Sequence, residues 1–523
     1  MKPSQPVSHP SGHVQLPLGL TPSESLEEAV RSTQALLVSD PNNLSLLNQL
    51  GALYLAQGRP EEGIGPLEKS LRISPDQFAT LSDYASGLGM LGRFQASLEI
   101  YERVIALNPD YVMAHYNRGL VLQILNHPGD ALASFERAIA LDPNCAPAHN
   151  NRGNILKGFN RLEEALESYD RVLALHPAHA EAHNNRGTVL QELHRLKDAL
   201  AAYDQALFLN PSYPAAHLNK SLLKLLTGNY EEGWRLYEWR WKADQKTEYR
   251  NFTQPLWLGE ESLKDRTLLV QAEQGLGDML QFCRYVPMLH EMGVKVILET
   301  PHPLVSILST LTDHLTVIEK GSPLPVFDYY CPVMSLPLAF KTTGETIPVK
   351  TPYLFADPSK ISVWQKRLGA KTRPRIALAW SGNVKNTSLR NRSVALEDLT
   401  PLLNLPFEFH SLQTEYRGND KSILPTFPQI RDHQSELKDF SDTAALVSEM
   451  DLVISVDTSV AHLTGALGKP LWVLLPFTTS FRWLLDRSDS PWYPTATLFR
   501  QSKPGDWSTV VSDVVRRIQK EFK

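Results

Sequence analysis

The chain has 523 residues, of which 42% are hydrophobic and 21% are charged. This composition is typical of globular proteins, and the length predicts two to four domains. The 52 basic and 57 acidic residues leave a net charge of −5, which gives no sign of a nucleic-acid-binding surface. The three cysteines lie far apart in the sequence, at Cys145, Cys283 and Cys331. We therefore expect the protein to form no structural disulfides and to be located in the reducing cytoplasm. No apolar run approaches the roughly 20 residues that span a bilayer, so no membrane insertion is expected.

Residues 1–22 are expected to form a flexible leader, because they lack the charged and apolar segments of a signal peptide. Residues 23–245 contain a period of 34 residues. Prolines recur at Pro41, Pro75, Pro109, Pro143, Pro177 and Pro211, and small residues at Gly51, Ala85, Gly119, Gly153, Gly187 and Ser221. This pattern resembles the tetratricopeptide repeat, in which small residues allow close helix crossings and Pro ends the second helix. We therefore expect an α-solenoid with a concave groove that binds another protein.

A file of polar residues follows the same period, on the helix that lines the groove in such arrays. A carboxamide can donate to and accept from the backbone of an extended peptide, whatever its side chains. The file resembles the asparagine ladder of the eukaryotic nucleocytoplasmic O-linked N-acetylglucosamine transferase, and it predicts peptide binding. The alternative, that these side chains only join neighbouring repeats, stays open. The residues are Gln49, Asp83, Asn117, Asn151, Asn185 and Asn219.

The last repeat, residues 229–245, keeps helical spacing but contains Trp234, Tyr237, Trp239 and Trp241. Large aromatic side chains in an atypical terminal repeat predict that it docks on the next domain. Residues 246–265 are expected to connect the array to that domain.

The second half is predicted to form two α/β lobes. The first, residues 266–370, begins with a strand, a tight turn at Gly275–Asp278 and a helix. The second, residues 371–523, contains residues 451–476, a stretch that predicts a buried strand, a turn, a helix and another buried strand. A helix over residues 506–522 is expected to return to the first lobe. Two such lobes facing a cleft form the GT-B double Rossmann arrangement of many glycosyltransferases.

Five motifs follow one another in this half: GLGDMLQFCRYVP, AWSGN with RNRS, SLQ, DFSDTAALVSEMDLVISVDTSVAHLTGALGKPLWVLLP and RWLLDRSDSPWYP. Together they resemble the bacterial heptosyltransferase-like glycosyltransferases of family nine, in particular the branch fused to tetratricopeptide repeats. Some members of that branch are implicated in flagellin glycosylation. The resemblance implies inverting transfer of a sugar from a nucleotide sugar to Ser or Thr of a protein held by the repeats, such as flagellin.

The resemblance makes Asp278 the general base for the acceptor hydroxyl, in a loop with Gln274, Gly275 and Gly277. A second interpretation, an Asp that only starts a helix, stays open. Free N–H groups at a helix start favour a diphosphate, cations can neutralise its charge, and Gln413 can reach the nucleotide base. The predicted donor site is Trp380, Ser381, Gly382, Asn383, Lys385, Arg392, Gln413, Asp457, Thr458, Ser459 and His462.

The polar loop after Trp380 departs from the related proteins, because Asn386 and Leu389 stand where a His and an Asp are often found. No acidic pair is placed to hold a divalent ion and no Cys/His cluster has zinc spacing, so we expect no metal and no cofactor.

Two alternative functions stay open. One is a glycosyltransferase acting on a glycan or a lipid-linked acceptor, and the other is a non-catalytic scaffold with a decayed transferase fold.

Overall fold

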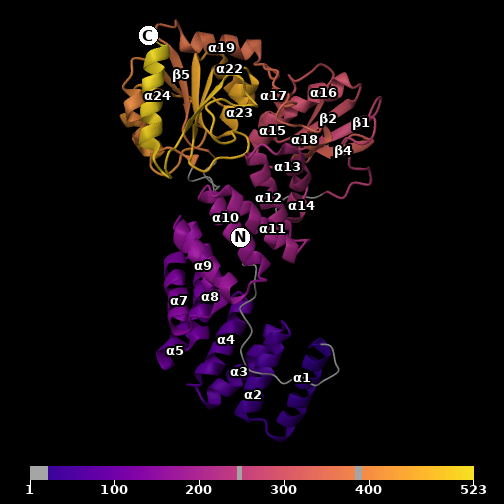
Figure 1. The fold of residues 1–523 in the computed structure, drawn as a ribbon, viewed down its shortest axis with the longest axis vertical. Helices are drawn as coiled ribbons and strands as arrows, with labels where there is room; N and C mark the ends of the chain where they lie inside the picture. Colours follow the sequence, from indigo (N-terminus) through magenta and orange to yellow (C-terminus); the bar gives the residue numbers. More distant parts are fainter. Residues whose placement is uncertain (1–21, 244–249, 383–391, 523) are drawn as a thin grey trace. The chain divides into compact units, whose positions relative to one another are not determined.

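The computed structural model describes residues 22–243, 250–382 and 392–522. The predicted leader therefore lies almost wholly outside the described residues. The chain divides into two compact units, Met1–Pro211 and Ser212–Lys523 (Figure 1). The last pair of repeat helices thus belongs to the second unit, together with the α/β region.

The first unit is an α-solenoid of antiparallel helix pairs, as the 34-residue period predicts (Figure 1). The second helix of each full repeat ends two residues before its proline, which fixes the turn into the next repeat. The helices are α1 (Pro22–Ser39), α2 (Leu44–Ala56), α3 (Pro60–Ile73), α4 (Phe78–Met90), α5 (Phe94–Leu107), α6 (Val112–Ile124), α7 (Pro128–Leu141), α8 (Ala146–Gly158), α9 (Leu162–Leu175), α10 (Ala180–Glu192) and α11 (Leu196–Leu209).

In the repeats that contain Gly119, Gly153 and Gly187, the two helices cross where glycine faces an aromatic ring. A Cβ added at Gly153 would lie 2.8 Å from the ring of Tyr169, and one at Gly187 would lie 2.6 Å from the ring of Tyr203. Both tyrosine rings are buried, with at most 1% of the residue exposed. The recurring small and aromatic residues are therefore complementary halves of one packing contact, repeated along the solenoid.

Gly153→Ala is expected to destabilise the first unit by about 1–3 kcal/mol, because the added methyl group overlaps the Tyr169 ring. Gly158→Ala, in the same helix, is the matched control, since nothing lies within 4 Å of its added Cβ. Its better helix propensity should raise stability by up to about 1 kcal/mol. Thermal unfolding followed by far-UV circular dichroism measures both. Equal effects of the two substitutions would contradict the close crossing.

The second unit begins with α12 (Pro214–Leu226), α13 (Tyr230–Tyr237) and α14 (Arg240–Ala243). Among the described residues, two parallel sheets follow, of four and six strands. The first has the order β3-β2-β1-β4, and the second has the order β10-β9-β8-β5-β6-β7. The strands are β1 (Thr267–Gln271), β2 (Lys295–Thr300), β3 (Thr316–Glu319), β4 (Tyr329–Pro332), β5 (Arg375–Ala379), β6 (Glu408–Ser411), β7 (Ile430–Asp432), β8 (Leu452–Val456), β9 (Leu471–Leu475) and β10 (Ala496–Arg500).

Helices cover these sheets and connect most of their strands, except β3 to β4 and β9 to β10 (Figure 1). The predicted α/β region is confirmed, and β7 is a short edge strand that sequence did not predict. The helices are α15 (Leu276–Phe282), α16 (Val286–Glu291), α17 (Val305–Leu308), α18 (Leu336–Ala339), α19 (Pro358–Leu368), α20 (Thr400–Leu403), α21 (Asp420–Ile423), α22 (Phe440–Ser448), α23 (Ser459–Ala466) and α24 (Trp507–Glu521).

The C-terminal helix does not return to the first lobe, and that prediction is wrong. The apolar side of α24, including Val510, Val514 and Ile518, is buried in one core with Ile376 and Leu378 of β5. The helix thus covers its own lobe's sheet (Figure 1). Its 3.6-residue apolar period is compatible with packing on either sheet. Such a period shows which face of a helix is buried, but it does not show which element covers that face.

Helix α19 precedes the predicted lobe boundary at residue 370, yet it packs on α22 of the second lobe. Lys360 pairs there with Asp439 and Asp442, at 3.2 and 2.8 Å. The chain has therefore already crossed to the second lobe where α19 begins.

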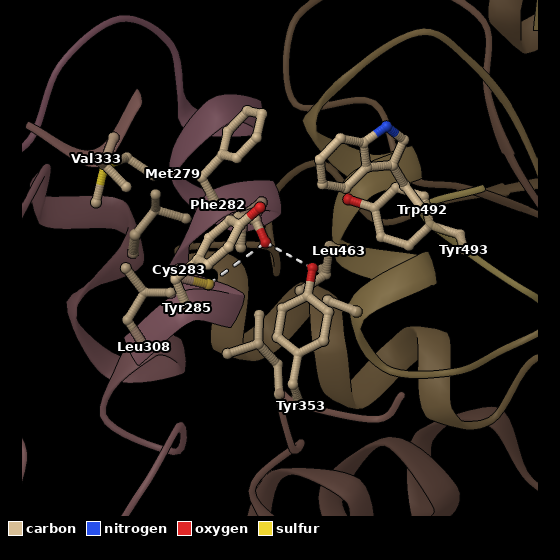
Figure 2. Close-up of a cluster of buried hydrophobic side chains, with 14 of the residues drawn as sticks. Met279, Phe282, Cys283, Tyr285, Leu308, Val333, Tyr353, Leu463, Trp492 and Tyr493 are labelled. Carbon is tan, nitrogen blue, oxygen red and sulfur yellow. Dashed lines mark hydrogen bonds between the residues drawn. The ribbon is translucent and has the colours of Figure 1, made fainter. Parts of the chain in front are cut away.

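The aromatic helix α13 contacts both lobes. The ring of Trp234 lies 5.9 Å from Phe282 of the first lobe and 5.4 Å from Phe481 of the second, edge to face in both cases. These rings extend a core in which Phe282 of α15 and Trp492 of the second lobe face each other (Figure 2). The terminal helices are thus part of the core between the lobes.

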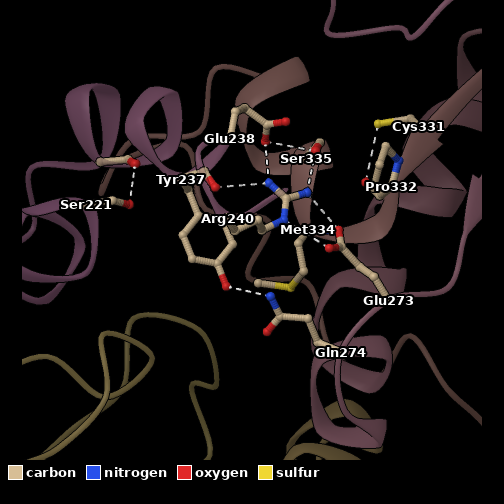
Figure 3. Close-up of polar contacts among 11 residues, drawn as sticks. Ser221, Tyr237, Glu238, Arg240, Glu273, Gln274, Cys331, Pro332, Met334 and Ser335 are labelled. Carbon is tan, nitrogen blue, oxygen red and sulfur yellow. Dashed lines mark hydrogen bonds and ion pairs between the residues drawn. The ribbon is translucent and has the colours of Figure 1, made fainter. Parts of the chain in front are cut away.

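Arg240 of α14 ties this helix to the first sheet through buried charge. Its guanidinium donates to both carboxylate oxygens of Glu273, at 2.8 and 2.9 Å, to Glu238 at 2.7 Å and to the Ser335 hydroxyl at 2.7 Å (Figure 3). Arg240 and Glu273 are 1% and 6% exposed. At such burial, either charge alone would be strongly unfavourable.

Arg240→Met is expected to lower the free energy of unfolding of the second unit by about 3–5 kcal/mol, because the Glu273 carboxylate stays buried without its partner. The control is Arg516→Met. Its ion pair with Asp513 is largely exposed, so a loss below about 1 kcal/mol is expected. Urea unfolding followed by tryptophan fluorescence measures both. A loss for Arg240→Met no larger than for the control would contradict the proposed weight of the buried pair.

Candidate functional site

The stretch from residue 451 to 476 folds in the predicted order of strand, turn, helix and strand. Every residue of β8 is buried, as in a strand covered on both faces. Thr458 then has an extended backbone and precedes α23 without capping it through its side chain. The first N–H groups of a helix lack intrahelical acceptors and lie at the positive end of its dipole. This turn can therefore offer the N–H groups of Ser459 and Val460 to an anion.

The matching corner of the first lobe is the loop between β1 and α15. Gln274 has a left-handed backbone, with φ of 59°, and its side-chain amide donates to the Tyr237 hydroxyl at 3.0 Å. Asp278 accepts the backbone N–H of Gly275 through Oδ2 at 3.1 Å, a bond that caps α15. Asp278 thus starts the helix, as the second interpretation holds, but it uses only one of its two carboxylate oxygens to do so.

The two corners meet. A Cβ added at Gly277 would lie 2.9 Å from His462 Cδ2 and 3.5 Å from Ser459 Cα, so a side chain there would force the corners apart. The second carboxylate oxygen of Asp278, Oδ1, accepts a hydrogen bond from Arg482 of the second lobe. The side chains of this ion pair are 15% and 14% exposed. Residues from both lobes therefore form one largely buried polar cluster.

Asp457 lies beside this ion pair and carries its own arginine. Arg392 Nη1 donates to Asp457 Oδ2 at 3.1 Å, and the Ser480 hydroxyl donates to the same oxygen at 3.5 Å. Burial by itself would raise the pKa of Asp457, but Arg392, followed by His462 and Arg482, outweighs it and holds that pKa below its usual value. Asp457 is therefore ionised at neutral pH and fixes Arg392 beside the start of α23.

His462 is buried between aromatic side chains. Its Nδ1 shares a 2.9 Å hydrogen bond with the Tyr493 hydroxyl, and its ring stacks on Trp483 with centroids 5.5 Å apart. Burial lowers the pKa of His462 to about 4, despite the nearby Asp457 carboxylate. The imidazole is therefore neutral at pH 7. It shapes the wall of the cluster and adds no charge to it.

The end of β5 forms a third corner beside these two. A Cβ added at Gly382 would lie 3.5 Å from the Thr458 methyl carbon, so this backbone borders the start of α23. Gln413 clasps Ser381, since its Oε1 accepts the Ser381 N–H at 3.1 Å and its Nε2 donates to the Ser381 hydroxyl at 2.8 Å. The Trp380 ring is buried, and its Nε1 donates to Asp420 at 3.0 Å.

The structure thus brings together Gly277, Asp278, Gly382, Arg392, Asp457, Thr458, Ser459 and His462, while Trp380 and Gln413 support the backbone around them. A direct contact of Gln413 with a nucleotide base is less suited to this geometry, because its carboxamide already holds Ser381 and also donates to Glu415. Asn383 and Lys385 lie outside the described residues, as do the departures at Asn386 and Leu389. Their roles stay predictions.

Arg482 is the residue of this cluster that sequence analysis gave no role. It belongs to RWLLDRSDSPWYP, one of the five ordered motifs, and this membership was the signal that the sequence offered. Its partner is Asp278, 204 residues earlier, and no sequence spacing links the two.

In the repeats, the file of polar side chains makes bonds between neighbouring helices. Asn151 donates to the Tyr116 hydroxyl at 3.3 Å, and Asn185 donates to Asn154 at 3.4 Å. Each bond uses one N–H of a group that has two donors and an acceptor, so joining repeats and binding a peptide are compatible. Of the other predicted residues, Gln49 is exposed, Asp83 is half-buried, Asn117 is buried and Asn219 lies in α12 of the second unit.

Burial raises the pKa of Asp83 to about 7. This position of the file therefore carries only part of a negative charge at neutral pH.

Comparison with known proteins identifies the repeats. The tetratricopeptide repeat family model matches residues 87–144, 122–180, 151–214 and 184–237. A curated relative, Protein FlbA of Caulobacter vibrioides, is 24% identical over 332 residues, which cover 57% of this chain and 54% of that protein. The chain therefore spans about half the length of this relative.

Solved structures of repeat proteins are similar to about a third of the chain. YrrB, a tetratricopeptide repeat protein with an unusual peptide-binding site, is 21% identical, with a TM-score of 0.33 over 37% of this chain and 100% of its own. MamA of Desulfovibrio magneticus RS-1 is 25% identical, with a TM-score of 0.31 over 32% of this chain and 96% of its own. The match of the family model is what identifies residues 87–237 as tetratricopeptide repeats.

Within the described residues, no three His, Cys, Asp or Glu side chains are grouped to hold a metal ion. In the same part of the chain, no helix is both long enough and apolar enough to cross a bilayer.

Acidification from pH 6.5 to 4 is expected to destabilise the second unit, in part through His462. Its folded-state pKa of about 4 lies below the unfolded value of about 6.5. Between these values the unfolded chain binds a proton that the folded chain does not, so stability is lost as the pH falls, by up to about 1.4 kcal/mol per pH unit.

Urea unfolding of His462→Asn across this range should show a shallower fall in stability than the wild type. The control is His302→Asn, whose side chain is 80% exposed and which should follow the wild type. An equally steep fall in His462→Asn would show that this imidazole does not resist protonation in the folded state.

Proposed function

We propose that the chain is a glycosyltransferase of GT-B type, which moves a sugar from a nucleotide sugar to Ser or Thr of a polypeptide held by the repeats. The observation that carries the proposal is the meeting of two strand-end corners, one from each lobe. One brings a carboxylate, Asp278, and the other brings a helix start with Arg392 beside it. A base and an anion site facing each other is the arrangement that glycosyl transfer requires.

In the proposed reaction, the acceptor oxygen attacks the anomeric carbon and its proton passes to the Asp278 carboxylate. The bond between the anomeric carbon and the diphosphate oxygen breaks, and its electron pair leaves with the nucleoside diphosphate. The N–H groups that open α23 and the Arg392 guanidinium stabilise that negative charge. Attack opposite the leaving group inverts the anomeric centre, and the proposed mechanism uses no metal.

The proposed acceptor is a polypeptide, because tetratricopeptide arrays typically bind peptide segments and carboxamides recur at one position of this array's repeats. Backbone recognition by carboxamides would position many sequences, and the α/β unit would then select the hydroxyl. Flagellin is the acceptor that the sequence resemblance suggests.

A non-catalytic scaffold is the second candidate function. The observation that favours it is that both oxygens of Asp278 are already engaged, by Gly275 and by Arg482. A scaffold of this kind would bind no nucleotide, and that difference separates the two functions.

Thermal-shift measurements with ADP, GDP, UDP and CDP are expected to show stabilisation by one preferred nucleotide, since a ligand of the folded state raises the melting temperature. With the matching nucleotide sugar, Asp278→Ala should lower transfer to the acceptor at least about 100-fold while acceptor binding persists. The control is Asp489→Ala, which removes an exposed carboxylate paired with Arg487. The absence of any stabilising nucleotide would support the scaffold, and full activity of Asp278→Ala would overturn the role of the base.

A further inference from the structure

Both carboxylate oxygens of Asp278 have hydrogen-bond partners within the protein. One carboxylate oxygen accepts the N–H that caps α15, and the other accepts from Arg482. A carboxylate that accepts a proton from a hydroxyl needs an oxygen that can face that hydroxyl. The Gly275 bond is part of the local fold of α15, whereas Arg482 comes from the other lobe. Arg482 is therefore the partner that can be exchanged without unfolding the corner.

Arg482 is a largely buried cation that uses few of its N–H donors. Its side chain is 14% exposed, and within the described residues its guanidinium makes one hydrogen bond, to Asp278. Arg284, buried in the same interlobe core, provides the contrast. Its guanidinium makes four hydrogen bonds, to Gln281, Pro348, Trp492 and Tyr353. A guanidinium has five N–H donors, so Arg284 has the environment of a structural arginine and Arg482 keeps donors for a further anion.

The anchoring of Arg482 limits its motion to its own side chain. The preceding Phe481 is 3% exposed and packs on Trp234 and Tyr237 of α13, with ring centroids 5.4 and 6.3 Å away. The guanidinium also lies close enough to Asp457 to lower the pKa of that carboxyl, an effect that acts against its burial. From this fixed point on the chain, Arg482 pairs with Asp278 of one corner, and its charge also acts on Asp457 of the other.

We propose that Arg482 is a ligand of the donor diphosphate, and that its transfer from Asp278 to the diphosphate frees the base. The inference rests on the proposed function and adds a residue and an order of events to it. A diphosphate carries more negative charge than a carboxylate and presents pairs of oxygens to a planar guanidinium, so it competes well for Arg482. The nucleotide sugar then binds first, and Oδ1 of Asp278 becomes available to take the proton of the acceptor hydroxyl only afterwards.

Calorimetric titration of the full-length chain with inorganic pyrophosphate and with ADP, GDP, UDP and CDP tests the first half of the proposal. Arg482→Gln should weaken the best of these ligands by about 10- to 100-fold, because charge-assisted hydrogen bonds to phosphate are lost. Arg487→Gln, five residues away and paired with Asp489, should bind like the wild type. Melting curves of both variants check that the unit stays folded.

Asp278→Asn tests the exchange itself. The amide oxygen can still cap α15, but the variant no longer holds Arg482 by charge, so the same ligand should bind about fivefold tighter or more. In the Arg482→Gln background the same substitution should change affinity less than about twofold. Equal tightening in both backgrounds would overturn the proposal, because the effect would then be simple charge repulsion by Asp278.

The outcomes separate the inference from the function on which it rests. Wild-type binding that Arg482→Gln leaves unchanged would overturn the role of Arg482 and leave the transferase in place. Failure of the wild type to bind any of the five probes would overturn both.

Discussion

The close contact between Gly277 and α23 sets the geometry of the α/β unit. With no side chain at this position, the first turn of α15 lies against His462 and Ser459, and the strand-end corners of the two lobes come within hydrogen-bonding reach. Asp278 can then pair with Arg482, and the two carboxylates and two arginines of the cluster balance one another in a largely buried place. A larger residue at 277 would separate the lobes before any change in the charged groups themselves.

Burial and neighbouring charges set the protonation states of the side chains in this cluster. His462 stays neutral because burial lowers its pKa, and Asp457 stays ionised because two arginines stand beside it. Gln413 and Trp380 use their polar atoms within the protein, on Ser381 and Asp420. The groups left to meet a ligand are backbone N–H groups and arginines, which suit an anion whatever base or sugar it carries.

Sequence alone predicted most of the architecture, because the features concerned are local or periodic. The 34-residue step located the helix pairs, and the apolar run before Asp457 located β8 and the turn that follows. Side-chain partnerships across the fold were not predictable in this way. Arg482 pairs with Asp278, which lies 204 residues earlier. The apolar face of α24 was compatible with either sheet, and it packs on the second. Gln413 was placed at the correct strand end, but no sequence spacing links it to its partner, Ser381.

The burial of Trp234 and Arg240 has a consequence for how such chains can be recombined. Both residues come from the last repeat, yet their side chains complete a core shared with Phe282, Phe481 and Glu273. A gene fusion that exchanged the solenoid at the end of the repeat pattern, near residue 245, would remove part of the α/β core along with the groove. The junction at Pro211 and Ser212 keeps that core whole. A different repeat array would therefore have to keep the final helix pair of this one.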